Sequence, residues 1–221
     1  MCHEAESATK KLRIGHRSES LRPGSQTMTL RDRKRERSRV LTAQTAWRLF
    51  IERGYDHVTV ADICASAEIA PRTFHRYFTG KDDVVAEPVR HMTGLVAEQI
   101  AAAPPEVSDS AALATAIHEL GIFVIEHRDW LGALRTVIQQ SPHLSATHQG
   151  VPPEREHELT RQLAARHGDA EPDWRLRLLV ACSVAAFRIW YDDYLRGLLM
   201  AEPLTRLDEM MTAVSRPDRD G

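Results

Sequence analysis

The chain has 221 residues and a hydrophobic content of 43%, so it can bury a sizeable core and accommodate two helical domains. No run of 18 apolar residues occurs, and the N-terminus lacks a contiguous apolar segment. These features argue against a membrane span and a secretory signal, and they predict a cytoplasmic protein. The odd number of cysteines suits a reducing compartment better than a disulfide framework, and we expect Cys64 and Cys182 in the core.

The formal net charge of −2 hides an uneven distribution along the chain. Residues 1–81 carry 16 Lys and Arg against 9 Asp and Glu, whereas residues 82–221 carry 13 against 22. A basic N-terminal part is expected if that part meets a polyanion such as DNA. Charge asymmetry of this kind also arises by chance, so it supports a nucleic-acid partner without establishing one.

Residues 1–30 mix Ser, Thr, Gly, Pro and charged residues without an apolar period, which predicts a disordered basic arm. Both Met1 and Met28 are candidate start residues. The basic run that follows, residues 31–39, leads into the first helix. It either reaches phosphates or the minor groove, or it is a solvated tail.

An amphipathic helix is predicted from Ser38 to Arg53, ended by Gly54. Its apolar positions are Val40, Leu41, Ala43, Trp47, Phe50 and Ile51. We expect Trp47 and Phe50 to lie in the core, where they hold the next two helices at a fixed angle.

Residues 58–81 read as two short helices joined by a tight turn. Apolar residues at helical spacing predict the first helix over residues 60–67, with Thr59 as its cap, and Pro71 suits the first turn of the second. In a helix-turn-helix the second helix enters the major groove, where Arg, Thr and His side chains reach base edges. By pattern alone, two short helices without a role in DNA binding fit equally well.

Residues 40–85 resemble the N-terminal domain of TetR-family transcriptional regulators. The resemblance rests on Leu49, Phe50, Gly54 and Tyr55, on Thr59 to Ile63, on Thr73 to Phe78, and on Lys81. It implies an all-α fold, with a three-helix helix-turn-helix DNA-binding domain over residues 31–81 and a helical ligand-binding and dimerisation domain over residues 82–216. Two positions depart from the family pattern: Glu68 replaces a turn glycine, and Ala70 replaces a capping serine.

Residue type and resemblance together indicate a set of DNA-contacting residues on and around the second helix. Lys81, at the start of the following helix, is implied to contact a phosphate. The expected DNA-binding residues are Thr59, Arg72, Thr73, His75, Arg76, Tyr77 and Lys81.

The remainder of the chain is predicted to be helical. We expect a helix over residues 82–102, kinked at Pro88, which the resemblance implies is the lever between the two domains. Further helices are expected over residues 108–127, 130–140, 154–167 and 173–200, and again after Pro203. The loop 141–153 contains three prolines and a glycine, which predicts a mobile connection.

Residues 173–200 are apolar on more than one face, so this helix needs two neighbours. A stripe along it and along the last helix is implied to form a four-helix interface with a second copy of the chain; the alternative is that the stripe is internal core. The expected interface residues are Phe187, Tyr191, Tyr194, Leu198, Leu204, Leu207 and Met211.

Apolar residues left over after packing predict a cavity for a small hydrophobic ligand, although core packing is the alternative at each position. A lipophilic drug, a fatty acyl thioester and an aromatic metabolite all remain open. The expected lining residues are Met92, Val96, His118, Phe123, Trp130, Leu134, Ile138 and Trp190.

No cofactor and no metal site are expected. The 11 histidines form no His/Cys pair at i,i+3 or i,i+4 in the C-terminal part, and no G-x-S-x-G, P-loop or dinucleotide glycine pattern indicates an enzyme. The function that follows is a homodimeric repressor that a small hydrophobic ligand releases from a palindromic operator. The alternatives are a ligand-independent architectural DNA-binding protein and a ligand-binding module with a degenerate DNA-binding part.

Overall fold

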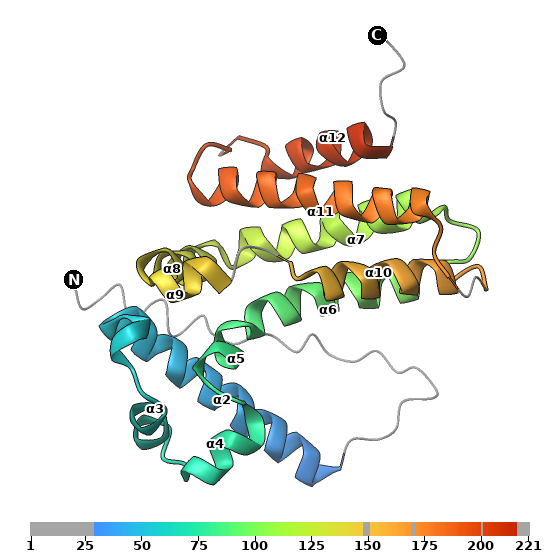
Figure 1. The fold of residues 1–221 in the computed structure, drawn as a ribbon. Coiled ribbons are helices and arrows are strands. Elements are labelled where there is room, and N and C mark those ends of the chain that lie inside the picture. The colour runs from blue at the N-terminus through green and yellow to red at the C-terminus, as the bar shows by residue number, and fades with distance from the viewer. Residues whose placement is uncertain (1–28, 148–150, 169–170, 200, 216–221) are drawn as a thin grey trace. The chain divides into compact units, whose positions relative to one another are not determined.

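The computed structural model describes residues 29–147, 151–168, 171–199 and 201–215, and within them every regular element is a helix (Figure 1). The chain divides into two compact units. Of the described residues, 29–87 and 132–147 form unit 1, and 88–131 and those from 151 onward form unit 2. Residues 1–28 of the predicted disordered arm lie outside the described residues. None of the described helices is both long enough and apolar enough to traverse a bilayer.

Unit 1 begins with α2 (Leu30–Arg53), which starts well before the predicted Ser38. Thr29 and Asp32 form a reciprocal capping box: the Asp32 amide donates to Thr29 Oγ1 at 3.2 Å, and the Thr29 amide donates to the Asp32 carboxylate at 3.2 Å. This cap fixes the helix start, so the basic run expected to lead into the helix is itself helical. Gly54, at φ 81°, ends the helix.

The predicted helix-turn-helix is present. After a short 3-10 turn (η1, Tyr55–His57), α3 spans Val60–Ser66 and α4 spans Pro71–Tyr77. Thr59 caps α3, as its position suggested. Trp47 and Phe50 of α2 are buried as predicted. Ile63, Cys64 and Phe74 of the two short helices are also buried, as is Phe78 directly after α4.

The two departures from the family pattern are visible in the backbone of the turn. Glu68 has φ 53°, in the left-handed region that a glycine enters without steric cost. Ala70 is the N-cap of α4 and offers no side-chain hydrogen bond to the helix. The turn therefore forms without a glycine at position 68 and without a capping side chain at position 70.

The single helix expected over residues 82–102 is wrong, because the structure has two helices there. α5 spans Lys81–Val85 and α6 spans Glu87–Ala102, with a turn at Ala86. Pro88 has no N–H to donate and its ring would clash with the Val84 carbonyl in a continuous helix, so the chain breaks before it. Pro88 thus lies in the first turn of α6, where proline is tolerated.

Unit 1 is completed by a segment from the middle of the chain. α8 (Arg128–Gln140) contributes its residues from Gly132 onward, and α9 spans Pro142–Thr147. The mobile loop predicted from residue 141 is therefore wrong as far as Thr147. The Ser145 hydroxyl donates to the Ile138 carbonyl at 2.9 Å and Leu144 is fully buried, which explains why the segment is folded despite its proline.

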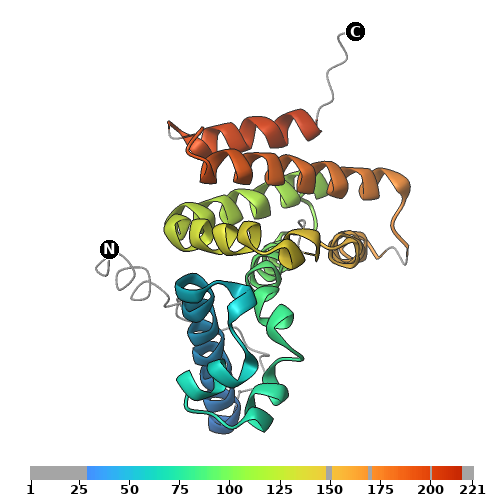
Figure 2. The ribbon, with the colours of Figure 1, turned by 60° about the vertical axis from the view of Figure 1, so that its left-hand side comes forward.

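Unit 2 contains most of α6 together with α7 (Asp109–Glu126), α10 (Pro153–Ala165), α11 (Trp174–Leu195) and α12 (Pro203–Ser215). α11 packs against α7, α10 and α12, and α12 also packs against α7 (Figures 1 and 2). α7 and α12 approach closely at Gly121, where an added Cβ would lie 2.6 Å from the Leu207 side chain. Cys64 is buried as expected, but Cys182 is exposed, because it points away from these neighbours.

Candidate DNA interface and partner surfaces

The α4 helix presents a charged outer face because its apolar residues face inward. Phe74 and the C-capping Phe78 are buried at 0% and 1% exposure, and their rings lie 5.5 Å apart. Arg72, His75 and Arg76 are exposed and Thr73 is half-buried, around an open surface hollow. The Arg72 side chain makes no hydrogen bond or ion pair with the part of the chain that the structure describes. Its guanidinium is thus available to an external acceptor.

Tyr77 at the end of α4 joins the helix to α2. Its hydroxyl accepts a hydrogen bond from Arg76 at 3.0 Å and bonds to Ser38, and the Arg76 guanidinium lies 5.0 Å from the Tyr77 ring centroid. Burial alone would raise the Tyr77 pKa, but the bonds to Ser38 and Arg76 and the charges of Arg76 and Arg35 together lower it. Tyr77 therefore lies in an electropositive environment.

Two other predicted DNA-binding residues are engaged within the protein. Thr59 accepts from the Asp62 amide and donates to the Asp62 carboxylate, which lowers the pKa of Asp62. Lys81 Nζ donates to the Tyr55 carbonyl at 3.0 Å and lies 4.1 Å from the centroid of the Tyr55 ring. An ammonium carries two further N–H groups, so a phosphate contact by Lys81 stays a prediction.

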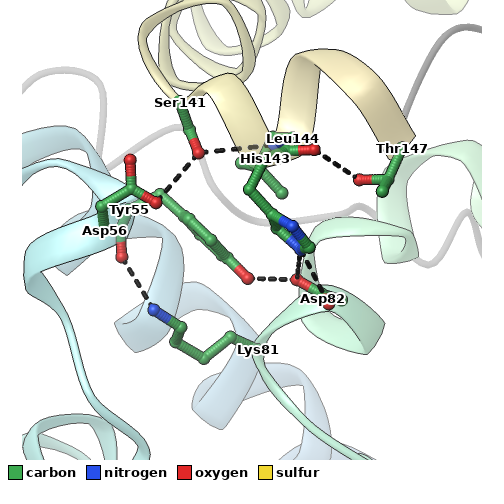
Figure 3. Close-up of polar contacts among 8 residues, drawn as sticks. All are labelled: Tyr55, Asp56, Lys81, Asp82, Ser141, His143, Leu144 and Thr147. Carbon is green, nitrogen blue, oxygen red and sulfur yellow. Dashed lines mark hydrogen bonds and ion pairs between the residues drawn. The ribbon is translucent and has the colours of Figure 1, made fainter.

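The sequence pattern did not reveal the contacts of α9 with the rest of unit 1, which Figure 3 draws. The Ser141 hydroxyl donates to Asp56 Oδ1 at 3.0 Å. His143 Nε2 lies 3.2 Å from each Asp82 oxygen, and the His143 ring stacks on Tyr55 at an interplanar angle of 11°. These contacts are named here the α9 bracket. No sequence motif predicts these contacts. Their partners are up to 85 positions apart, and one partner of each lies in a segment that the sequence predicts to be a loop.

Tyr55 is the centre of the α9 bracket. Its phenol donates a hydrogen bond to Asp82, its carbonyl accepts from Lys81, and its ring contacts both His143 and Phe50. Burial, followed by the bond to Asp82, raises the Tyr55 pKa above its usual value, so the phenol remains a donor at neutral pH. The tyrosine that carries part of the family resemblance therefore ties η1, α5 and α9 together.

The residues predicted to line a ligand cavity do not share one environment. Trp190 is fully buried and its indole N–H donates to the Pro203 carbonyl at 2.6 Å, so it is part of the α11–α12 packing. His118 Nδ1 lies 2.8 Å from Asp208 of α12, at the surface. Leu134 and Ile138 belong to unit 1. Val96 is buried and Met92 half-buried on α6.

Phe123 and Trp130, by contrast, belong to a row of four aromatic rings within unit 2. The His91 ring lies 5.2 Å from Phe123, Phe123 stacks on His127 at 4.2 Å, and His127 lies 6.5 Å from Trp130. The buried Trp130 Nε1 has no acceptor within the described residues. A buried donor without a partner is costly, and Trp47 Nε1 in unit 1 is buried in the same way.

The structure revises the predicted dimer stripe. Tyr194, Leu207 and Met211 are 5%, 0% and 2% exposed within the single chain, because they pack between α7, α11 and α12. Phe187, Tyr191 and Leu204 are half-buried, and Leu198 is exposed. Internal packing thus buries three of the seven residues, and an interface role for the other four stays a prediction.

The opposite face of α11 is apolar and exposed. Trp174, Leu178 and Ile189 are 62%, 55% and 53% exposed, and they share this side of the helix with Ala181, Cys182 and Ala185. This set is named here the α11 outer face. A groove of about 630 Å³ runs along it between α10 and α11, lined partly by His157, Thr160 and Arg177. Contiguous exposed apolar surface of this kind is typical of a protein–protein contact.

No group of three or more His, Cys, Asp or Glu side chains in the described residues is arranged to hold a metal ion.

Comparisons with known proteins agree with this geometry. Residues 44–87 match the family model for bacterial regulatory proteins of the tetR family. The HTH-type transcriptional regulator TcmR of Streptomyces glaucescens is 31% identical over 175 residues, covering 73% of this chain and 76% of that protein.

Solved structures show the same fold. NalD of Pseudomonas aeruginosa, the secondary repressor of the MexAB-OprM multidrug efflux pump, superposes with a TM-score of 0.57 at 18% identity, covering 85% of this chain and all of that one. A tetR-family regulator from Streptomyces coelicolor superposes with a TM-score of 0.51 at 19% identity, covering 81% of this chain and 79% of that one. The chain therefore belongs to the tetR family of bacterial regulatory proteins, and it is a DNA-binding transcription regulator rather than an enzyme.

Proposed function

We propose that the protein is a homodimeric repressor that a small hydrophobic ligand releases from a palindromic operator. The observation that carries this proposal is the outer face of α4, where Arg72, His75 and Arg76 are exposed while Phe74 holds the helix in the core. Arg and His side chains on a fixed helix match the donors and acceptors of base edges in the major groove. Such a regulator acts where the chromosome is, so the expected compartment is the cytoplasm.

The α11 outer face supports dimerisation, with a second copy of the chain as its partner. Residues 174 to 189 of α11 extend over about 22 Å at a helical rise of 1.5 Å per residue. A two-fold interface uses the same patch on both copies, so this apolar face would cover itself. A dimer would also place two α4 helices on the two half-sites of a palindrome.

The aromatic row supports a ligand site in unit 2. Phe123, His127 and Trp130 offer flat ring surfaces, and the unpartnered Trp130 N–H offers one directional hydrogen bond. Small-molecule sites commonly combine apolar surface with a few such polar contacts. An aromatic ligand that carries a hydrogen-bond acceptor fits this combination best. The two imidazoles of the row, His91 and His127, add polar edges to it.

A route from the ligand to the DNA is supported by the course of the chain. α8 begins with Trp130 close to its start and leads directly to Ser141 and His143 of the α9 bracket. A ligand that shifts α8 would change contacts to Asp56 and Asp82 in the DNA-binding unit. The coupling between the two binding events is expected to be about 1–3 kcal/mol, or about 5- to 150-fold in affinity, and it must be reciprocal.

The proposal is tested first by selecting bound sites from random duplex DNA with the full chain at a stated salt concentration. We expect an inverted repeat, because each subunit reads one half-site. Arg72→Ala should lose that preference, with Arg161→Ala, an exposed arginine of α10, as the matched control. A recovered site without two-fold symmetry would contradict a dimeric reader.

The recovered duplex then serves as the probe in a screen of aromatic and aliphatic small molecules. We expect release by an aromatic compound from the wild type and a weaker response from Trp130→Phe, which keeps the ring surface but lacks the N–H. Operator affinity that stays constant across the whole panel would favour a ligand-independent DNA-binding protein.

A further inference from the structure

The N-terminal part of α2 separates its basic residues into two faces. At 100° per residue, Arg31 and Arg35 lie on the same side as Ser38 and the buried Thr42, whereas Arg33 and Arg37 lie on the opposite side with the exposed Leu30. Lys34 lies between the two sides. Arg31 and Arg35 are named here the α2 basic face. Because the Thr29–Asp32 capping box starts the helix before them, these side chains project from a helix of fixed register.

The α2 basic face is continuous with α4. Ser38 bonds to Tyr77, the last residue of α4, and the charge of Arg35 acts on the same phenol. Arg39, one turn further on, lies 5.9 Å above the ring of Phe78, which caps α4. Figures 1 and 2 both draw α4 beside the N-terminal half of α2. The basic face therefore begins where the exposed side chains of α4 end.

The neighbouring charges leave this face basic. Arg39 is held by Glu36 at 2.9 Å and by Glu87 at 2.7 Å, so it is a structural residue that fastens α2 within unit 1. Asp32 lies near Arg31 and Arg35, but its carboxylate is hydrogen-bonded to Thr29, which is the main reason that its pKa is lowered. Arg31, Lys34 and Arg35 are all exposed.

We propose that the α2 basic face is a second DNA-binding surface, which neutralises backbone phosphates beside the groove that α4 enters. The proposal rests on the DNA binding proposed above and adds to it a contact that carries affinity without sequence information. Each phosphate that a cation neutralises adds about 0.9 to the slope of log K against log salt concentration. Arg31 and Arg35 together should therefore contribute about 2 to this slope for each subunit.

The test compares two double variants of the full chain that remove the same charge from the same helix. Arg31→Gln/Arg35→Gln alters the α2 basic face, and Arg33→Gln/Arg37→Gln alters the opposite face. Operator affinity is measured at several salt concentrations, together with affinity for an unrelated duplex, and circular dichroism checks the helix content. We expect the first variant to lower the slope by about 2 per subunit on both duplexes and to leave their affinity ratio unchanged, and the second to lower it by less than half as much.

The outcomes separate this inference from the proposed function. A wild-type chain that fails to discriminate any duplex would refute the proposed function. A wild-type chain that does discriminate, with equal slopes in the two double variants, would overturn the inference alone, because the charge would then act without regard to face. A changed affinity ratio in Arg31→Gln/Arg35→Gln would also overturn it, since phosphate contacts carry no base preference.

Discussion

The two units of the chain expose opposite kinds of surface. In unit 1 the exposed side of α4 carries Arg72, His75 and Arg76, whereas in unit 2 the exposed side of α11 carries Trp174, Leu178 and Ile189. Cationic side chains favour a polyanion in water, and a contiguous apolar face favours a partner that removes it from water. The difference is the one that we expect if, as proposed above, unit 1 contacts DNA and the α11 outer face of unit 2 meets a second copy of the chain.

The strongest test of this division compares two fully buried aromatic residues, Phe74 of unit 1 and Trp190 of unit 2. Replacing either with alanine removes a large buried side chain and should cost about 3–5 kcal/mol of unfolding free energy. Phe74→Ala should abolish operator binding but keep the dimer, and Trp190→Ala should lose the dimer. Calorimetry, sedimentation and DNA binding of both variants would measure this. If Phe74→Ala loses the dimer as well as operator binding, the two units unfold as one.

A second comparison, within unit 1, separates reading of bases from contact with phosphates. Arg72→Ala should cost about 1–3 kcal/mol of discrimination between the operator and its single-base variants. Lys81→Ala should instead weaken binding to every duplex and lower the salt slope by about 1. Competition binding at several salt concentrations distinguishes the two effects. Identical behaviour of the two variants would mean that Lys81, bonded to the Tyr55 carbonyl, acts by holding α5 in place.

The DNA-binding helices were predictable because their signals are local. Thr59 caps α3 three residues before Asp62, and Pro71 begins α4, so each boundary depends on neighbours in the sequence. The start of α2 was missed although the same signal was present. Thr29 and Asp32 have the capping-box spacing, but the apolar period that marks the rest of the helix does not reach them.

The contacts of α9 and the role of the α11 faces were not predictable, because they depend on distant residues. Ser141 meets Asp56 only in the folded unit 1. On α11, apolar residues occur on more than one side, and periodicity cannot tell which side meets α7 and α12. The resemblance implied that the stripe through Tyr194 meets a partner copy, whereas Tyr194 is buried within the chain and the exposed apolar residues of α11 include Leu178 on its other side.

Two substitutions in the turn before α4 should stabilise unit 1. Glu68→Gly relieves a left-handed residue and Ala70→Ser supplies the missing N-cap, with about 1 kcal/mol expected from each. Urea unfolding of the double variant should show the combined gain of about 2 kcal/mol. Glu98→Gly, an exposed position inside α6, is the control and should lose about 1 kcal/mol. An unchanged free energy of unfolding in the double variant would mean that neither Glu68 nor Ala70 destabilises the turn.

The smallest effect, and the one that bears on communication within unit 1, is expected from the α9 bracket. Ser141→Ala removes the hydrogen bond to Asp56 and the longer bond, at 3.4 Å, that Ser141 Oγ accepts from the Leu144 amide. Loss of the bond to Asp56 should cost about 0.5–1.5 kcal/mol. Because that bond ties α9 to the DNA-binding helices, the amides of η1 and α3 should exchange with solvent up to about 10-fold faster. Ser145→Ala likewise removes a serine hydroxyl, this one within α9, which donates to the Ile138 carbonyl of α8. Its η1 and α3 amides should keep their wild-type rates. Equal acceleration in the two variants would show that α9 stabilises unit 1 only as a whole, and the bond from Ser141 would then not be a specific link between α9 and the DNA-binding helices.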